Sequence, residues 1–185
     1  YALLENVEAL KKAESLQRAV KIVRDAKLPR EAVPTQWLTE AAMWDALLPH
    51  MPMTAMLRNV ATMTRVGLLR SGSNATKLVT AQLRDGDRLR KARVHPLGVL
   101  AALNTYRKGR GVKGSGTWEP VAAVIDALDD AFYTSFGAVT PSGKRMLLAL
   151  DVSGSMTTGA VAGIAGLTPR EASAAMALVT AATER

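Results

Sequence analysis

Prolines and glycines divide the first part of the chain into short segments with helical periodicity, and this pattern most constrains the fold. Within each segment the apolar residues recur three and four positions apart, as they do along the buried face of a helix. Each segment ends near a proline or glycine, which interrupt helices. Short helices joined by short turns predict an all-α helical-repeat stack over residues 1–138. The predicted helices cover residues 1–27, 37–48, 54–66, 75–83, 87–93, 97–108 and 120–136.

The pattern changes at residues 140–143, which read Thr-Pro-Ser-Gly. The apolar run that follows, residues 146–150, is typical of a strand covered on both faces. Thr168 and Glu171 then form a capping box, which predicts the start of a helix. Strand, loop and helix make the first unit of an α/β sheet, so residues 139–185 are predicted to begin a second domain of the α/β class.

The predicted strand ends at Asp151, the first residue of an Asp-x-Ser-x-Ser motif with Ser153 and Ser155. This spacing presents three hard oxygen ligands from one tight loop to a divalent cation such as magnesium. A serine-rich turn capped by Asp151 is the alternative interpretation. A complete site of this type needs further ligands from later loops, which would lie beyond Arg185. We therefore expect the metal site to be incomplete in this chain.

Positive charge is concentrated between residues 58 and 113. This block holds thirteen Lys or Arg and only two acids, Asp85 and Asp87, whereas the rest of the chain holds eleven bases and fourteen acids. The block therefore accounts for more than the whole net charge of +8. Such a block is typical of a protein that binds nucleic acid. A solvated helix face that only aids solubility is the alternative.

Residues 107–114 form a basic, glycine-rich loop inside this block. Its glycines let the backbone approach a phosphate closely, while the loop presents four cations, Arg107, Lys108, Arg110 and Lys113. The loop lacks the Gly-Lys-Ser/Thr ending of a nucleotide-binding P-loop. A flexible basic connection between helices is the alternative interpretation.

His95 follows Arg93 at the entrance of a predicted helix. Capping or packing is one interpretation of this histidine, and contact with an RNA strand beside Arg93 is the other. With two histidines and no cysteine, the chain offers no acid–base or nucleophilic constellation, so we do not expect an enzyme. The lack of cysteine also excludes disulfides and fits a reducing compartment.

No apolar run reaches the length of a membrane span, and no signal peptide opens the chain. We expect a cytoplasmic protein without membrane association. Tyr1 and Arg185 both lie inside predicted helices, so we also expect this chain to be an internal fragment of a longer protein.

Several motifs, in the right order, resemble the TROVE module of the Ro autoantigen family. They are residues 44–48 (Trp-Asp-Ala-Leu-Leu), 51–59 (Met-Pro-Met-Thr-Ala-Met-Leu-Arg-Asn), 91–96 (Lys-Ala-Arg-Val-His-Pro), 105–111 (Thr-Tyr-Arg-Lys-Gly-Arg-Gly) and 131–133 (Ala-Phe-Tyr). Residues 141–156 similarly resemble the join to that family's von Willebrand factor A domain. The likeness covers nearly the whole chain.

The resemblance implies a ring of HEAT-like helical repeats, closed by a von Willebrand factor A-like domain with a metal-ion-dependent adhesion site. Such rings hold small non-coding Y RNAs outside and pass single-stranded 3′ ends of misfolded RNAs through a basic hole. The family acts in RNA quality control and, in bacteria, in RNA processing with an exoribonuclease. The Ala- and Arg-rich sequence indicates a bacterial member. A metal-dependent protein-adhesion module is the alternative function.

The predicted sites combine the basic block with this resemblance. The family match places Arg58 and Asn59 on a ring-forming helix, where they would face the hole and contact single-stranded RNA. The full set of predicted RNA contacts is Arg58, Asn59, Arg93, His95, Arg107, Lys108, Arg110 and Lys113, and the predicted metal ligands are Asp151, Ser153 and Ser155.

Overall fold

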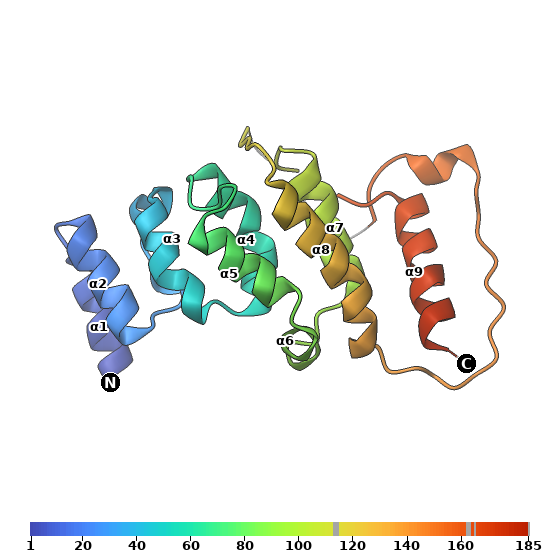
Figure 1. Cartoon of the computed structure of the whole chain (residues 1–185), viewed down its shortest axis with the longest axis horizontal. Coiled ribbons are helices and arrows are strands. Elements are labelled where there is room, and N and C mark those ends of the chain that lie inside the picture. The colour runs from blue at the N-terminus through green and yellow to red at the C-terminus, as the bar shows by residue number, and fades with distance from the viewer. Residues whose placement is uncertain (113–114, 162–163, 165, 185) are drawn as a thin grey trace.

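The computed structural model describes residues 1–112, 115–161, 164 and 166–184. Its α-helices lie side by side in a row, with α1 and α2 at one end and α9 at the other (Figure 1). The α-helices are α1 (Ala2–Lys11), α2 (Leu16–Ala26), α3 (Ala41–Leu47), α4 (Met53–Arg65), α5 (Asn74–Leu83), α6 (Gly86–Lys91), α7 (Pro96–Arg107), α8 (Ala122–Thr134) and α9 (Pro169–Thr183). Short 3-10 helices cover Arg30–Ala32, Thr35–Thr39, Leu48–His50, Ser135–Ala138 and Gly154–Thr157.

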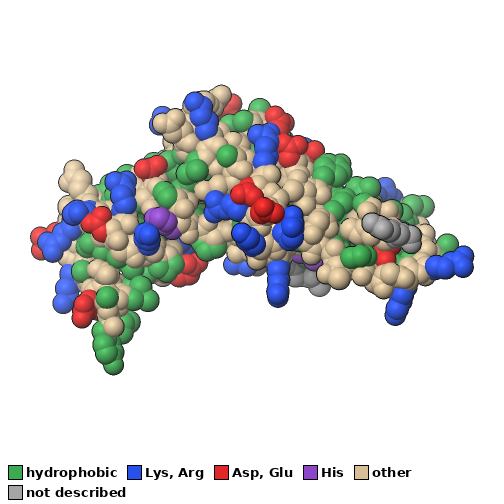
Figure 2. Space-filling view, turned by 60° about the horizontal axis from the view of Figure 1, so that its bottom comes forward, with side chains coloured by type: hydrophobic (Ala, Val, Ile, Leu, Met, Phe, Trp, Pro, Cys, Tyr) green, Lys and Arg blue, Asp and Glu red, His purple; other side chains and the backbone are tan. Residues whose placement is uncertain are grey.

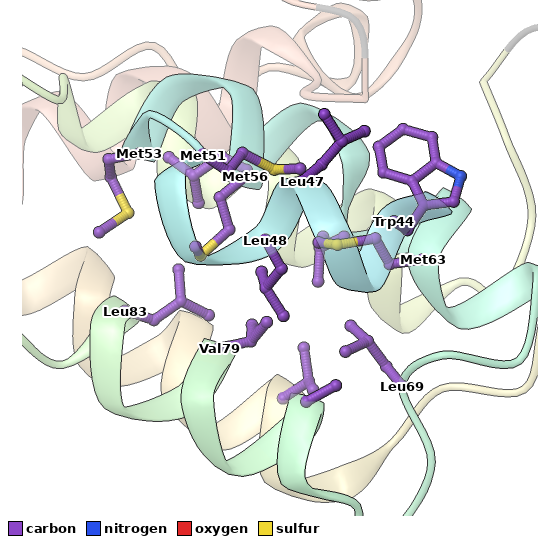
Figure 3. Packing of buried hydrophobic residues seen from close by; sticks show 14 of the residues in the cluster. Trp44, Leu47, Leu48, Met51, Met53, Met56, Met63, Leu69, Val79 and Leu83 are labelled. Carbon is purple, nitrogen blue, oxygen red and sulfur yellow. The ribbon is translucent and has the colours of Figure 1, made fainter. Parts of the chain in front are cut away.

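A continuous hydrophobic core runs between the helices and is built mainly from Leu, Met, Val and Ala. Figure 3 shows Leu48 pointing toward Val79, with Met56 and Met63 on either side. Trp44 is almost fully buried, and its indole Nε1 donates to the carbonyl of Leu38 at 2.8 Å. Apolar side chains that recur at helical spacing thus face their neighbours along the row, which explains why these short helices hold together.

A buried tyrosine joins α4, α7 and the start of α8. The Tyr106 hydroxyl lies 2.9 Å from Thr64 Oγ1 and accepts a hydrogen bond from Val121 N at 3.1 Å. Thr64 already donates its own hydroxyl proton to the Val60 carbonyl at 3.0 Å. Tyr106 therefore donates to Thr64 and accepts from Val121, so its hydroxyl has a partner both as a donor and as an acceptor.

The predicted all-α organisation of the first part is confirmed, with three local corrections. The helix predicted over residues 1–27 is two helices, because Ser15 caps a new helix by accepting from Arg18 N. The helix predicted over residues 37–48 is broken by extended backbone at Glu40. The helix predicted over residues 87–93 is α6, which begins at Gly86 after the N-cap Asp85 and ends at Lys91. Whether these helices form HEAT-like repeats stays a prediction.

The strand predicted over residues 146–150 is wrong for this chain. Residues 145–153 form irregular, exposed backbone, with Leu147 95% exposed. Figure 1 shows this segment as a long loop outside α9. A strand needs a neighbour for its backbone hydrogen bonds. Among the described residues the only ladder contact is the isolated bridge between Arg110 and Thr117, so no strand is present to pair with residues 146–150.

The helix predicted after this segment is confirmed as α9. Thr168 Oγ1 accepts from Glu171 N, and the Glu171 carboxylate accepts from Thr168 N at 2.8 Å, which completes the capping box. The helix packs against α7, where Asn104 Nδ2 donates to Glu171 at 3.2 Å. At the far end, the Glu184 carboxylate accepts from the backbone N–H of Ser142 and of Gly143, which fastens the start of the exposed segment to α9. None of the helices described here could cross a membrane.

Candidate nucleic-acid interface

A groove runs between α4 and α7 and ends under the loop of residues 109–118. We call it the α4–α7 groove; it is lined by Leu57, Arg58, Val60, Ala61, Thr62 and Arg65 of α4, Gly98, Ala101, Ala102, Thr105 and Tyr106 of α7, and Gly111, Val112, Ser115, Gly116 and Trp118 of the loop. It has two adjoining parts of about 350 and 370 Å³. Arg58, Ala61 and Thr105 line both parts, so the two are continuous.

The part nearest the loop is polar and basic. Arg58 and Arg65 are seven residues apart on α4 and so lie on one face of that helix. Neither has an ion-pair partner among the described residues, and no acidic side chain lines the groove. Hydroxyl groups of Thr62, Thr105 and Ser115 line the same space. This combination of guanidinium and hydroxyl donors is suited to a phosphate.

The loop over this part is held by backbone pairing at its described ends. Gly111 N donates to the Gly116 carbonyl at 3.0 Å, and Trp118 N donates to the Gly109 carbonyl at 2.9 Å. The Arg65 guanidinium lies close against Gly116, because a Cβ there would lie 2.7 Å from Arg65 Nη1. The Trp118 indole is fixed by donating to the Tyr106 carbonyl at 3.0 Å. The described ends of the loop therefore pair with each other through backbone hydrogen bonds, and the flexible-connection alternative stays open.

The eight predicted RNA contacts do not form one cluster. Arg93 and His95 lie before the first turn of α7, and Arg107 and Lys108 lie at its other end. Twelve helical residues separate these ends by about 18 Å. Arg58 lies in the groove between them.

The structure decides some of these residues' local roles. His95 Nδ1 accepts from Leu97 N at 3.2 Å, which confirms the capping interpretation and leaves the RNA role a prediction. Asn59 is half-buried, and its Nδ2 donates to the Ala55 carbonyl within α4. Arg110 is exposed on the loop, whereas Lys113 lies outside the described residues.

Another part of the basic block, on α6, is partly neutralised. Figure 2 shows Lys and Arg side chains gathered over the middle of the face on which α6 comes forward, around a small acidic patch. Arg90 pairs with Asp87 at 3.1 Å, and Arg84 pairs with Asp130 at 2.7 Å. This surface therefore fits the alternative interpretation of the basic block, a solvated helix face, better than the lining of the α4–α7 groove fits it.

Sequence reasoning missed Arg65 and Trp118 as candidates for this site. The seven-residue spacing from Arg58 to Arg65 could have indicated a shared helix face. No comparable signal marked Trp118, because its position depends on how the loop of residues 109–118 folds back over α7.

The Asp151 loop brings its three predicted ligands together even without a strand. Asp151 Oδ1 accepts from Ser153 N at 2.8 Å, and the Oγ atoms of Ser153 and Ser155 lie 2.9 Å apart. The Ser153 backbone N–H, then its hydroxyl, and the nearby Arg170 guanidinium lower the pKa of Asp151, so this carboxylate is anionic at neutral pH. One carboxylate and two hydroxyls form an all-oxygen donor set that fits a hard divalent cation.

Two features limit this loop as a metal site. All three ligand side chains are exposed, and the Arg170 guanidinium donates to the carbonyls of Val152 and Ser153, which places a positive charge beside them. Among the residues that the structure places, no group of three or more His, Cys, Asp or Glu could hold a metal.

Comparisons with known proteins match most of the chain. The TROVE domain model matches residues 18–105, and the Ro60 vWA domain model matches residues 145–185. RNA-binding protein RO60 of Deinococcus radiodurans is 48% identical over 157 residues, or 84% of this chain and 29% of that protein. RNA-binding protein RO60 of Caenorhabditis elegans is 44% identical over 151 residues, or 81% of this chain and 23% of that protein.

A solved structure shares the fold. The crystal structure of the Deinococcus radiodurans RO (RSR) protein matches with a TM-score of 0.89 and 42% identity, covering 99% of this chain and 37% of that one. The chain thus spans about a quarter to a third of the length of these curated relatives. With matches to both domain models and close relatives in two organisms, the chain belongs to the Ro60 family and carries parts of its TROVE and vWA domains.

Proposed function

We propose that this chain binds RNA, mainly through its phosphates, along the α4–α7 groove. The observation that carries the proposal is the pair of unneutralised arginines, Arg58 and Arg65, in a groove without acidic side chains in its lining. Arginine donors match phosphate oxygens in geometry and charge, and such contacts bind any sequence. Arg107, Lys108 and Arg110 extend the positive surface at the loop end of the groove.

The named relatives support this proposal, since both are called RNA-binding proteins. The finer functions that the family resemblance implies are also proposals. They are holding Y-type RNA, receiving single-stranded 3′ ends of misfolded RNA through a ring of HEAT-like repeats, and working with an exoribonuclease. We propose binding rather than catalysis, and we propose that the protein is cytoplasmic.

Salt dependence tests the proposal directly. Binding of a single-stranded RNA to the chain should weaken as salt rises, with a logarithmic slope of about −0.7 for each phosphate neutralised. A gel shift at several salt concentrations, with and without magnesium, measures this slope. Binding that requires magnesium and ignores salt would contradict phosphate contact by the groove.

The Asp151 loop favours a second function, metal-dependent protein adhesion. The donor set of Asp151, Ser153 and Ser155 would hold a divalent cation such as magnesium, and the bound cation would attract a carboxylate from a partner protein. The short distances within the loop support this proposal, while the exposed ligands and the nearby Arg170 weaken it for this chain. Magnesium titration of the chain by calorimetry tests it.

A further inference from the structure

The second part of the α4–α7 groove differs in chemistry from its basic part. Its floor is apolar, made by Leu57, Val60 and Ala61 of α4 and by Ala101 and Ala102 of α7. Small side chains on α7 leave room there, and the part measures about 350 Å³. A single apolar space beside two arginines is an arrangement that phosphate contact alone does not require.

Gly98 borders open space in this apolar part. It lies in the first turn of α7, lines the groove, and has no other atom within 4 Å of the position that a Cβ would take. Glycine is unfavourable inside a helix by about 0.5–1 kcal/mol relative to alanine. Its backbone is not in the left-handed region, so the helix does not need glycine for its conformation.

Arg58 connects the apolar and basic parts. Its side chain lines both, so a group seated in the apolar part and an anion beside Arg65 would lie on either side of the same guanidinium. Single-stranded RNA carries this pair of chemistries in each nucleotide, a flat base and a phosphate. Bases that are free of stacking partners bind to apolar and aromatic surfaces, whereas bases in a duplex are already stacked and paired.

We propose that the α4–α7 groove is a single-nucleotide subsite for single-stranded RNA, with the base in the apolar part and the phosphate at Arg58 and Arg65. This inference rests on the proposed RNA binding by this chain, and it adds the position at which one base of the RNA is bound. Arg58 lies at the junction and contacts the sugar–phosphate side of the base. Gly116 serves the phosphate end, because it lets the Arg65 guanidinium lie close against the loop.

Two substitutions at one position test the base pocket. Gly98→Leu places a branched side chain in the open apolar part without changing charge, and Gly98→Ala makes the same backbone change with a single methyl group. Both variants should fold, since helix propensity improves in each. The probes are a fluorescent single-stranded RNA octamer and an abasic octamer with the same number of phosphates, with affinities measured by anisotropy at constant low salt.

We expect Gly98→Leu to weaken RNA binding about tenfold, the size of effect expected when one stacked base loses its platform. Gly98→Ala should stay within about twofold of the original chain, and neither variant should change binding of the abasic octamer. Equal RNA affinity for the leucine and alanine variants would overturn the base pocket while leaving phosphate binding intact. No RNA binding by the unaltered chain would overturn both proposals.

The phosphate end has its own test. Gly116→Ala pushes the Arg65 guanidinium from its place without removing charge, so it should weaken both octamers about equally. Arg65→Gln should do the same more strongly. Gly137→Ala changes an exposed glycine that, like Gly116, lies outside the left-handed region and that has no atom within 4 Å of its Cβ position, so it serves as the matched control for the backbone change. If Arg65→Gln and Gly137→Ala bind both octamers alike, the role of Arg65 in the subsite is wrong.

Discussion

The helical row and the segment after Ala138 differ in how far their backbone groups are hydrogen-bonded and their apolar side chains are buried. In the row, each helix closes its backbone hydrogen bonds internally and buries its apolar face against a neighbour. In residues 140–153, backbone groups lack ladder partners, and Met146, Leu147 and Val152 are at least half exposed. Helices need only local contacts, whereas a buried strand needs a sheet built from distant residues.

This difference extends from the fold to the two candidate sites. The α4–α7 groove is lined by residues of α4, of α7 and of the described ends of the loop after α7, which the helical row itself positions. The Asp151 loop forms its local turn, but the segment before it is exposed and irregular. Its only predicted ligands are one carboxylate and two hydroxyls. The comparison therefore favours RNA binding over metal-dependent adhesion for this chain.

The largest effect should come from the core of the row. Trp44→Ala removes a buried ring and its hydrogen bond to Leu38, so the free energy of unfolding should fall by about 3–5 kcal/mol. Urea unfolding followed by circular dichroism measures this loss. A loss of under 1 kcal/mol would mean that the row does not depend on this core.

The Tyr106 junction should give a smaller loss. Tyr106→Phe keeps the ring but leaves Val121 N without its acceptor and Thr64 without a donor, at a cost of about 1–3 kcal/mol. The same unfolding experiment applies, with Tyr133→Phe as control because Tyr133 is 54% exposed. Equal stability of the two variants would show that the Tyr106 hydroxyl does not join these helices.

Magnesium binding should be weak and should depend on charge. We expect Asp151→Asn to lower the affinity of the chain for magnesium at least about tenfold, since ligand charge sets the affinity of such sites. The control, Asp129→Asn, removes one carboxylate away from the loop. Calorimetry that finds tight magnesium binding, or identical binding by both variants, would contradict the assignment of Asp151, Ser153 and Ser155.

The exposed segment should give the smallest effect. Leu147→Ser should change the free energy of unfolding by less than about 0.5 kcal/mol, because this side chain is already 95% exposed. A loss comparable to that of the Trp44 variant would show that residues 146–150 are buried in solution, and it would remove the contrast between the two regions.

The sequence predicted the helices well because their signals are local. Apolar spacing and breakers located α4, α5, α7 and α8, and the Thr168–Glu171 capping box located α9. Local signals also explain the errors. Ser15 is a good N-cap inside an apparently continuous helical pattern, and Asp85 and Asp87 are equally plausible caps from their residue type alone.

The sites were predictable only in part. The oxygen cluster at Asp151 follows from spacing within five residues, and the structure forms it. The groove joins Arg58 to Thr105 and Trp118, which lie 47 and 60 positions further along the chain, and only packing brings them together. The prediction of a strand over residues 146–150 was wrong because its apolar pattern is typical of a buried strand, and these residues are exposed in this chain.

The central claim is that the α4–α7 groove neutralises RNA phosphates, and the salt slope of RNA binding tests it most directly. Replacing Arg58, Arg65 and Arg110 by Gln should flatten the logarithmic slope by roughly 2 units, about 0.7 for each lost phosphate contact. The matched control replaces Lys12, Arg18 and Arg30, which are exposed and without ion pairs among the described residues, and removes the same charge outside the lining of the groove. The account predicts a flattened slope for the groove variant and an unchanged slope for the control. Equal slopes for the two variants would contradict it.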